Sequence, residues 1–154
     1  MNVVSNTSPI IFLSKLDALY LLPQCFDNIA IPAGVSRELG EIVLPSYITI
    51  TPISEAGRQY IIGAVGALHA GELEAMVLSQ ETKSDYILLD DLAARRKATH
   101  QGLSVIGTVG IIALANAKKL LSAATTHQYY DALVGEHGLY LSAEVLRRVK
   151  AKIR

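Results

Sequence analysis

A short, almost continuously apolar segment, Tyr86–Leu89, runs directly into the acidic pair Asp90-Asp91. A strand without polar alternation is typical of a parallel sheet, because helices cover such a sheet on both faces. Further short runs of this kind are Asn2–Ser5, Asn28–Pro32 and Leu103–Ile106. Segments with helical spacing separate these runs. The alternation predicts an α/β fold with a parallel sheet between two layers of helices.

The remaining elements follow from apolar spacing and from proline, glycine and capping residues. Helices are expected over Pro9–Leu16, Ala18–Phe26, Val35–Leu39, Glu55–His69, Gly71–Gln80, Leu92–His100, Val109–Leu121, Ser122–Val134 and Ser142 to the end. Tyr47–Ile53 alternates and is expected as an edge strand. Because no repeat or long linker interrupts the pattern, we predict one domain over residues 1–154. Its architecture is three-layer α/β/α around a mostly parallel sheet.

Composition narrows the classes of function. The chain is 51% hydrophobic and 18% charged, with a formal net charge of zero, so it resembles neither a basic RNA coat protein nor a polybasic membrane binder. A local basic patch can still bind nucleic acid. The single cysteine, Cys25, fits a reducing compartment and is expected in the core. Without a signal peptide or a membrane-spanning stretch, we expect a cytoplasmic protein that does not bind membranes.

Polar residues gather where the predicted strands end. In an open parallel sheet, ligands bind outside the carboxyl ends of the strands. The residues expected at or near this edge are Asn6, Thr7, Ser8, Glu38, Glu72, Glu74, Asp90, Asp91 and Thr108. Converging carboxylates repel each other unless a cation is present. Hard oxygen ligands suit Mg²⁺ or Mn²⁺, which activate water for phosphodiester hydrolysis. The cluster therefore favours metal-dependent phosphoryl chemistry.

Each of these residues also has an ordinary structural role open to it. Asn6 can cap the first helix, and Asp90 or Asp91 can cap the helix that follows them. Glu72 lies in a first helical turn, where the helix dipole favours a carboxylate. Glu38 can simply be solvated. The functional interpretation rests on their joint placement.

Two basic clusters lie on predicted helices. The first follows the Asp90 strand and contains Arg95, Arg96, Lys97 and His100. It is either a solvated helix face or a phosphate clamp beside the acidic edge, and on the second interpretation Arg95 and Arg96 support RNA binding. The second cluster lies on the last helix, at Arg147, Arg148, Lys150, Lys152 and Arg154. It is expected to be solvated or to bind a partner.

Five segments in this order resemble the PIN-domain family. They are Val3–Pro9, Ile31-Pro32 with Glu38-Leu39, Gly71–Ala75, Leu88–Asp91 with Ala94-Arg95, and Gly107–Gly110. The resemblance covers nearly the whole chain and implies a PIN-like fold. It places the family's acidic quartet on Asn6, Glu38, Glu72 and Asp90, with Glu74 and Asp91 competing for the last two positions. Thr108 matches a supporting position.

The resemblance implies a Mg²⁺- or Mn²⁺-dependent endoribonuclease, with RNA as substrate. Resemblance to toxins of the VapC type adds a small antitoxin and a homodimer as expected partners. Asn6 stands where PIN nucleases usually have aspartate, and its amide offers a carbonyl oxygen without charge. The alternative function is therefore a weakened PIN scaffold that binds RNA or protein without cutting. A small-molecule phosphatase on another doubly wound fold is a third alternative, which Asn6 disfavours because that class uses an aspartate nucleophile there.

Overall fold

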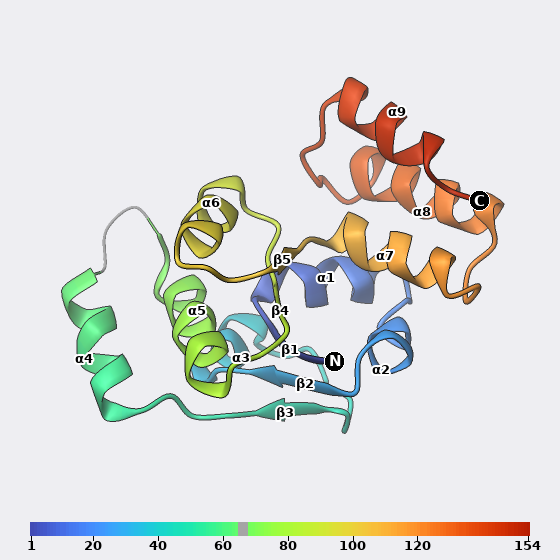
Figure 1. Ribbon diagram of the computed structural model, residues 1–154. Coiled ribbons are helices and arrows are strands. Elements are labelled where there is room, and N and C mark those ends of the chain that lie inside the picture. Colours follow the sequence, from blue (N-terminus) through green and yellow to red (C-terminus); the bar gives the residue numbers. More distant parts are fainter. Residues whose placement is uncertain (65–67) are drawn as a thin grey trace.

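The computed structural model describes residues 1–64 and 68–154. Within them, the strands of the sheet are β1 Asn2–Ser5, β2 Asn28–Ile31, β3 Ile48–Ile50, β4 Tyr86–Leu88 and β5 Val105–Ile106. The helices are α1 Thr7–Lys15, α2 Leu21–Cys25, α3 Ala33–Leu39, α4 Glu55–Ala64, α5 Ala70–Thr82, α6 Leu92–His100, α7 Thr108–Ala117, α8 Ala123–Gly135 and α9 Ala143–Ala151. The elements alternate as the sequence predicts (Figure 1).

The sheet has the strand order β3-β2-β1-β4-β5, and every ladder in the described residues is parallel. The expected "mostly parallel" sheet is thus fully parallel. The chain moves outward from β1 to β3 and then crosses to β4 on the other side of β1. This reversal creates a topological switch point between β1 and β4, where the crevices of open α/β sheets form.

Successive residues of the central strands serve opposite faces of the sheet. Val3 and Leu88 belong to a buried cluster built with α1, α2, α3 and α7. Val4 and Ile87 belong to a second cluster, built with α4, α5 and α6. Each central strand is therefore apolar on both sides, as its sequence predicts. Cys25 is buried in the first cluster.

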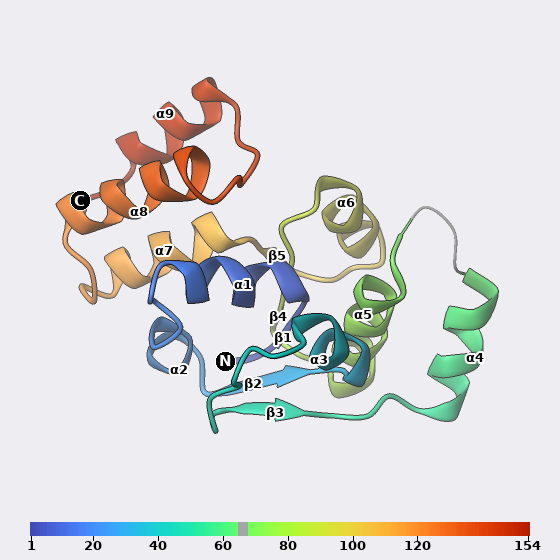
Figure 2. The same ribbon diagram turned by 180° about the vertical axis from the view of Figure 1, so that it is seen from behind.

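Two helices lie outside the three layers. Figures 1 and 2 show α8 against α7, with α9 beyond α8, at the end of the molecule that carries the C-terminus. Tyr130 of α8 is buried and its hydroxyl donates to the carbonyl of Val109 at 3.2 Å. No helix in residues 1–64 and 68–154 combines the length and apolar content that crossing a membrane requires.

Several predicted boundaries need correction. The helix expected over Ala18–Phe26 is shorter: residues 18–20 form turns, and α2 spans only Leu21–Cys25. The edge strand expected over Tyr47–Ile53 is paired only at Ile48–Ile50. Pro52 has no N–H to extend that ladder.

Two further helices differ from expectation. The helix expected over Glu55–His69 ends at Ala64 among the described residues, and part of the predicted span, residues 65–67, lies outside them. The helix expected over Val109–Leu121 begins one residue early, at Thr108, and ends at Ala117. Lys119, with φ 63, turns the chain towards α8.

Candidate functional site

The predicted polar edge forms at the switch point. Ser5 pairs with Leu88 in the register of β1 and β4, and the Asn6 N–H donates to the Leu88 carbonyl at 3.0 Å. Helix α1 begins directly after Asn6, and Asp90 follows β4 by two residues. The first and last members of the predicted quartet are therefore delivered by neighbouring strands to the same edge of the sheet.

Asn6 is buried, with 3% of its surface exposed, and its Oδ1 has no hydrogen-bond partner among the described residues. It precedes α1 but makes no side-chain cap bond, so the simple capping role does not account for it. A buried acceptor without a partner costs about 1–3 kcal/mol. Such an atom is expected where a ligand supplies the missing contact.

Glu38 reaches this edge from the end of α3. Its Oε2 accepts the hydroxyl hydrogen of Thr7, the neighbour of Asn6, at 2.6 Å. Its carboxyl group also lies against Gly71 in the first turn of α5. A Cβ at Gly71 would collide with Oε1 and lie 2.8 Å from Cδ. The missing side chain of Gly71 is thus what allows Glu38 to approach α5.

Glu72 is the next residue of α5, and it faces two other carboxylates. Burial raises the pKa of Glu72, and the charges of Asp91 and Glu38 raise it further, whereas a hydrogen bond from His69 N–H at 3.2 Å lowers it. Asp91 is the N-cap of α6 and accepts from the Ala94 N–H at 2.9 Å. Glu38, Glu72 and Asp91 therefore form one interacting acidic group.

Asp90 is bound by α7 and not by the group of Glu38, Glu72 and Asp91. Its two oxygens accept from the N–H and the hydroxyl of Thr108, both at 2.7 Å, at the start of α7. Burial raises the pKa of Asp90, while these hydrogen bonds and the nearby Arg95 lower it. Arg95 Nη1 donates to the Leu89 carbonyl at 2.9 Å. A Cβ at Gly107 would lie 2.5 Å from that Nη1 and 3.1 Å from Asp90 Oδ1, so this glycine makes room for both groups.

Glu74 occupies a different environment from Glu72. Its Oε2 accepts from the Gly34 N–H at 2.8 Å, and its Oε1 lies 3.6 Å from Arg37 Nη2. These contacts place Glu74 at the first turn of α3, where a carboxylate is favoured by the free N–H groups. Ser8 is half-buried in the first turn of α1.

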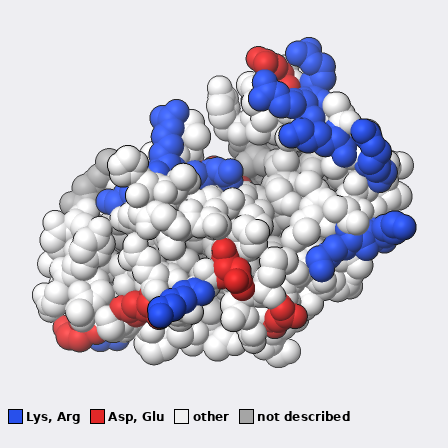
Figure 3. All heavy atoms as spheres, in the orientation of Figure 1, with Lys and Arg blue, Asp and Glu red and all other residues white. Residues whose placement is uncertain are grey.

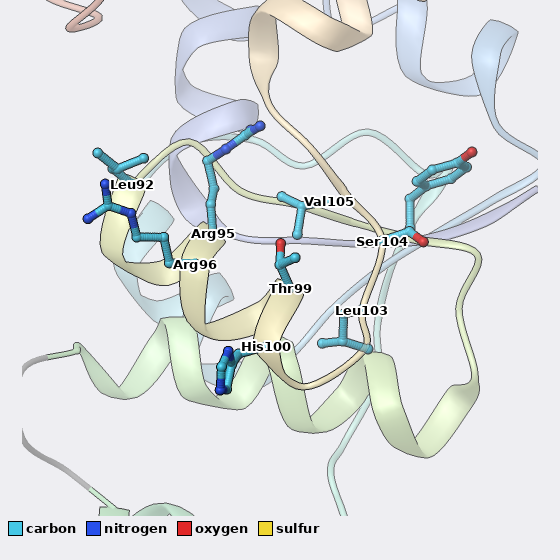
Figure 4. A pocket seen from close by; sticks show the side chains of 9 residues that line it. Leu92, Arg95, Arg96, Thr99, His100, Leu103, Ser104 and Val105 are labelled. Carbon is cyan, nitrogen blue, oxygen red and sulfur yellow. The ribbon is translucent and has the colours of Figure 1, made fainter.

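Cationic side chains border the acidic edge on the α6 side. A broad pocket of about 900 Å³ lies against α6 and the approach to β5, and Figure 4 shows Arg95 and Arg96 leaving the helix in different directions. Thr99 and His100 line the same pocket. In Figure 3, Lys and Arg side chains gather over α6 and over the α8–α9 end, with a hollow between the two groups.

The geometry does not assemble a ready-made cage of carboxylates. Within the described residues, no three His, Cys, Asp or Glu side chains are close enough to hold a metal ion on their own. The oxygen set at the edge includes an amide, Asn6, and its carboxylates are partly engaged with protein donors. The donor chemistry nevertheless fits a hard cation, because every candidate ligand is an oxygen and one of them is buried without a partner.

The sequence analysis did not predict a role for three glycines that lie against side chains near this edge. Gly34 and Gly71 accommodate Glu74 and Glu38, and Gly107 accommodates Arg95. For two of them the sequence did hold an indication: Gly71 directly precedes Glu72, and Gly107 directly precedes Thr108, at the starts of predicted helices. A glycine at such a position can mark a close approach of another chain segment, but only the structure identifies the group that approaches.

A fully parallel sheet with a buried amide, carboxylates and an arginine at its switch point defines an α/β protein with an oxygen-rich site bordered by cationic side chains. A PIN-domain family model matches residues 2–154, and the chain therefore belongs to the PIN-domain family. This confirms the predicted resemblance. PIN domains are generally nucleases, so the chain has a nuclease-type fold. A comparison with curated proteins finds no match to this chain.

Proposed function

We propose that this protein is a Mg²⁺- or Mn²⁺-dependent endoribonuclease that hydrolyses phosphodiester bonds of RNA. The observation that carries the proposal is Asn6 Oδ1, a buried acceptor without a partner at the end of β1. It lies next to Thr7, which binds Glu38, and beside the strand that leads to Asp90. This placement supports Asn6 Oδ1 as an oxygen ligand of a cation.

Within this proposal the residues divide into three roles. Asn6, Glu38 and Glu72 would hold the cation, and Asp91 adds negative charge close to Glu72. Asp90 would face the same space, oriented by Thr108. When bound, the cation supplies activation of water and stabilisation of the charge that develops on the phosphate. The contacts of Glu74 with α3 favour Glu72 over Glu74 as the ligand from α5.

Arg95 and Arg96 would bind and position the RNA backbone. Arg95 is half-buried, donates to the Leu89 carbonyl and interacts with the charge of Asp90, so its own charge is fixed close to the acidic group. Arg96 is exposed on the neighbouring pocket. Arginines beside an acidic centre attract a polyanion that the carboxylates alone would repel. The zero net charge of the chain is therefore compatible with RNA as substrate.

Cleavage of single-stranded RNA by the purified full chain with Mn²⁺ tests the proposal. Asp90→Asn is expected to reduce the cleavage rate at least 100-fold, as is typical when a positioned catalytic group is removed. Asp85→Asn is the matched control, because Asp85 precedes the same strand at the opposite edge and accepts from the Asn2 N–H. Equal cleavage by both variants would refute the assignment.

Asn6 favours one alternative, a PIN scaffold that binds RNA or protein without cutting. Calorimetric titration with Mn²⁺ separates the two functions. Tight binding by the unmodified chain supports the nuclease. RNA binding without Mn²⁺ binding or cleavage supports the alternative, and Asn6→Asp is then expected to restore affinity for the cation because it adds the missing charge.

A toxin role, with a small antitoxin and a homodimer as partners, forms the finer part of the proposal. Its basis is the resemblance of the sequence to toxins of the VapC type. Expression of the chain is then expected to arrest growth, and expression of the Asp90→Asn variant is expected not to. Light scattering on the purified chain measures whether it is a dimer.

A further inference from the structure

A second pocket adjoins the acidic edge. It encloses about 620 Å³ between α6, the start of α7 and the segment that joins α8 to α9. Asp90 and Arg95 lie at its boundary, and most of the exposed lining is apolar, including Leu92, Val109 and Val145. A volume in this range and an apolar wall with few polar groups are typical of a ligand site.

Three of the apolar side chains around this pocket are exposed. Tyr140 has 92% of its surface exposed, Leu92 60% and Val145 36%. A large aromatic side chain that is almost fully solvated gains nothing from the core of its own protein. Exposed apolar groups that surround a concave surface usually mark a binding site. The pocket therefore presents an apolar slot with an aromatic side chain free to stack.

Its position relative to the cationic pocket on α6 indicates the ligand. Leu92, Arg95 and Val105 line both pockets. A single strand of RNA offers a phosphate backbone for Arg95 and Arg96, and unstacked bases for an apolar slot and an aromatic ring. Figure 3 shows basic side chains on both sides of the hollow between α6 and the α8–α9 end. RNA, which combines a charged backbone with flat bases, therefore matches the arginines of the first pocket and the apolar wall of the second.

We infer that the pocket between α6 and the α8–α9 segment binds one unpaired nucleobase of the RNA, next to the phosphate at the acidic edge, with Tyr140 stacking on the base. This inference rests on the proposed ribonuclease function and adds a base subsite to it. The subsite tolerates different bases, because stacking uses the face that all bases share.

The test uses a short RNA with one cleavage site and its analogues with a single abasic nucleotide on either side of that site. For the unmodified chain, one abasic position is expected to lower kcat/KM about tenfold, the size of one lost base stack. Tyr140→Ala is expected to cause a similar loss on intact RNA and no further loss on the abasic RNA. Tyr140→Phe is expected to restore both values, because the ring and not the hydroxyl provides stacking.

Tyr60→Ala is the matched control, since Tyr60 lies on α4 and has 48% of its surface exposed. It is expected to leave kcat/KM unchanged. If the unmodified chain cuts intact and abasic RNA equally well, or if Tyr140→Ala keeps the full abasic effect, the subsite is wrong while the ribonuclease function stands. If the chain binds RNA without cutting, the same series is measured by fluorescence anisotropy without Mn²⁺. Equal affinity of the unmodified chain for intact and abasic RNA also overturns the inference there, as does a chain that binds no RNA.

Discussion

Gly71→Ala is expected to change the geometry of the acidic edge while leaving the stability of the fold nearly unchanged. Gly71 lies in the first turn of α5 with the Glu38 carboxyl group against it. An added Cβ would collide with Oε1 and come within 2.8 Å of Cδ, so the carboxyl group must retreat by about 1 Å. A displacement of this size at a reacting centre can reduce the rate about 100-fold. We therefore expect kcat/KM for RNA cleavage to fall between about 10- and 100-fold.

The effect on folding is expected to be small. Alanine in place of glycine stabilises a helix by about 0.5–1 kcal/mol. Displacement of Glu38 costs its hydrogen bond with Thr7, about 0.5–1.5 kcal/mol. These contributions nearly cancel, so the free energy of unfolding should change by no more than about 1 kcal/mol, measured by urea denaturation.

Gly63→Ala provides the control for this substitution. Gly63 is also helical, on α4, and an added Cβ there meets no atom within 4 Å among the described residues. It should gain about 0.5–1 kcal/mol of stability and leave cleavage unchanged. Full activity in Gly71→Ala would refute the idea that this glycine sets the position of Glu38. A loss of several kcal/mol would show that the activity change reflects unfolding.

The remaining predictions concern the carboxylates and their partners. Thr108→Val removes the hydroxyl that binds Asp90 at 2.7 Å; a loss of about 1 kcal/mol in denaturation and a cleavage rate about tenfold lower are expected, and an unchanged rate would show that Thr108 does not position Asp90. Glu74→Gln weakens the contact with the Gly34 N–H and should lower stability by about 0.5–1 kcal/mol with little change in cleavage; loss of cleavage without loss of stability would instead make Glu74 a ligand. Burial raises the pKa of Glu72 above the ordinary glutamate value of 4.5, so the folded state binds its proton more tightly than the unfolded state. The free energy of unfolding therefore falls as pH rises from about 4.5 through the folded pKa. Glu72→Gln should therefore raise Tm at pH 7 without metal, and this advantage should disappear below about pH 4.5. A lower Tm at pH 7 would contradict the conclusion that ionised Glu72 destabilises the fold.

Sequence patterns predicted the parts of the fold that depend on local physics. The helix over Leu92–His100 has the predicted bounds, because Asp91 caps it and Gly102 follows it. The apolar strand before Asp90 is also present, one residue shorter than predicted at Tyr86–Leu88, since a strand buried on both faces excludes polar residues. The extent of Ile48–Ile50 could not be predicted. Its length depends on pairing with β2, a contact with a distant segment.

The candidate site also has parts that the local sequence predicts and parts that depend on contacts between distant segments. The sequence predicted that Asn6 and Asp90 reach one edge of the sheet, because parallel strands place their carboxyl ends together. It left the choice between Glu72 and Glu74 open. Which of the two side chains faces the edge depends on the orientation of α5 about its own axis, and this orientation directs Glu74 to the first turn of α3. Neighbouring positions on a helix face different directions, and only packing decides which direction is the site.

The position of Asn6 gives the acidic edge an electrostatic balance that an aspartate would change. Glu72 already bears a raised pKa because burial and the charges of Asp91 and Glu38 oppose its ionisation. A fourth carboxylate with 3% exposure at Asn6 would add a buried charge beside this group, and such a charge is costly unless it is paired. The amide avoids that cost in the metal-free protein, yet it keeps an oxygen that can bind a cation. An amide at this position therefore exchanges affinity for a cation against stability in its absence, and under the proposed function we expect a slower nuclease than an aspartate would give.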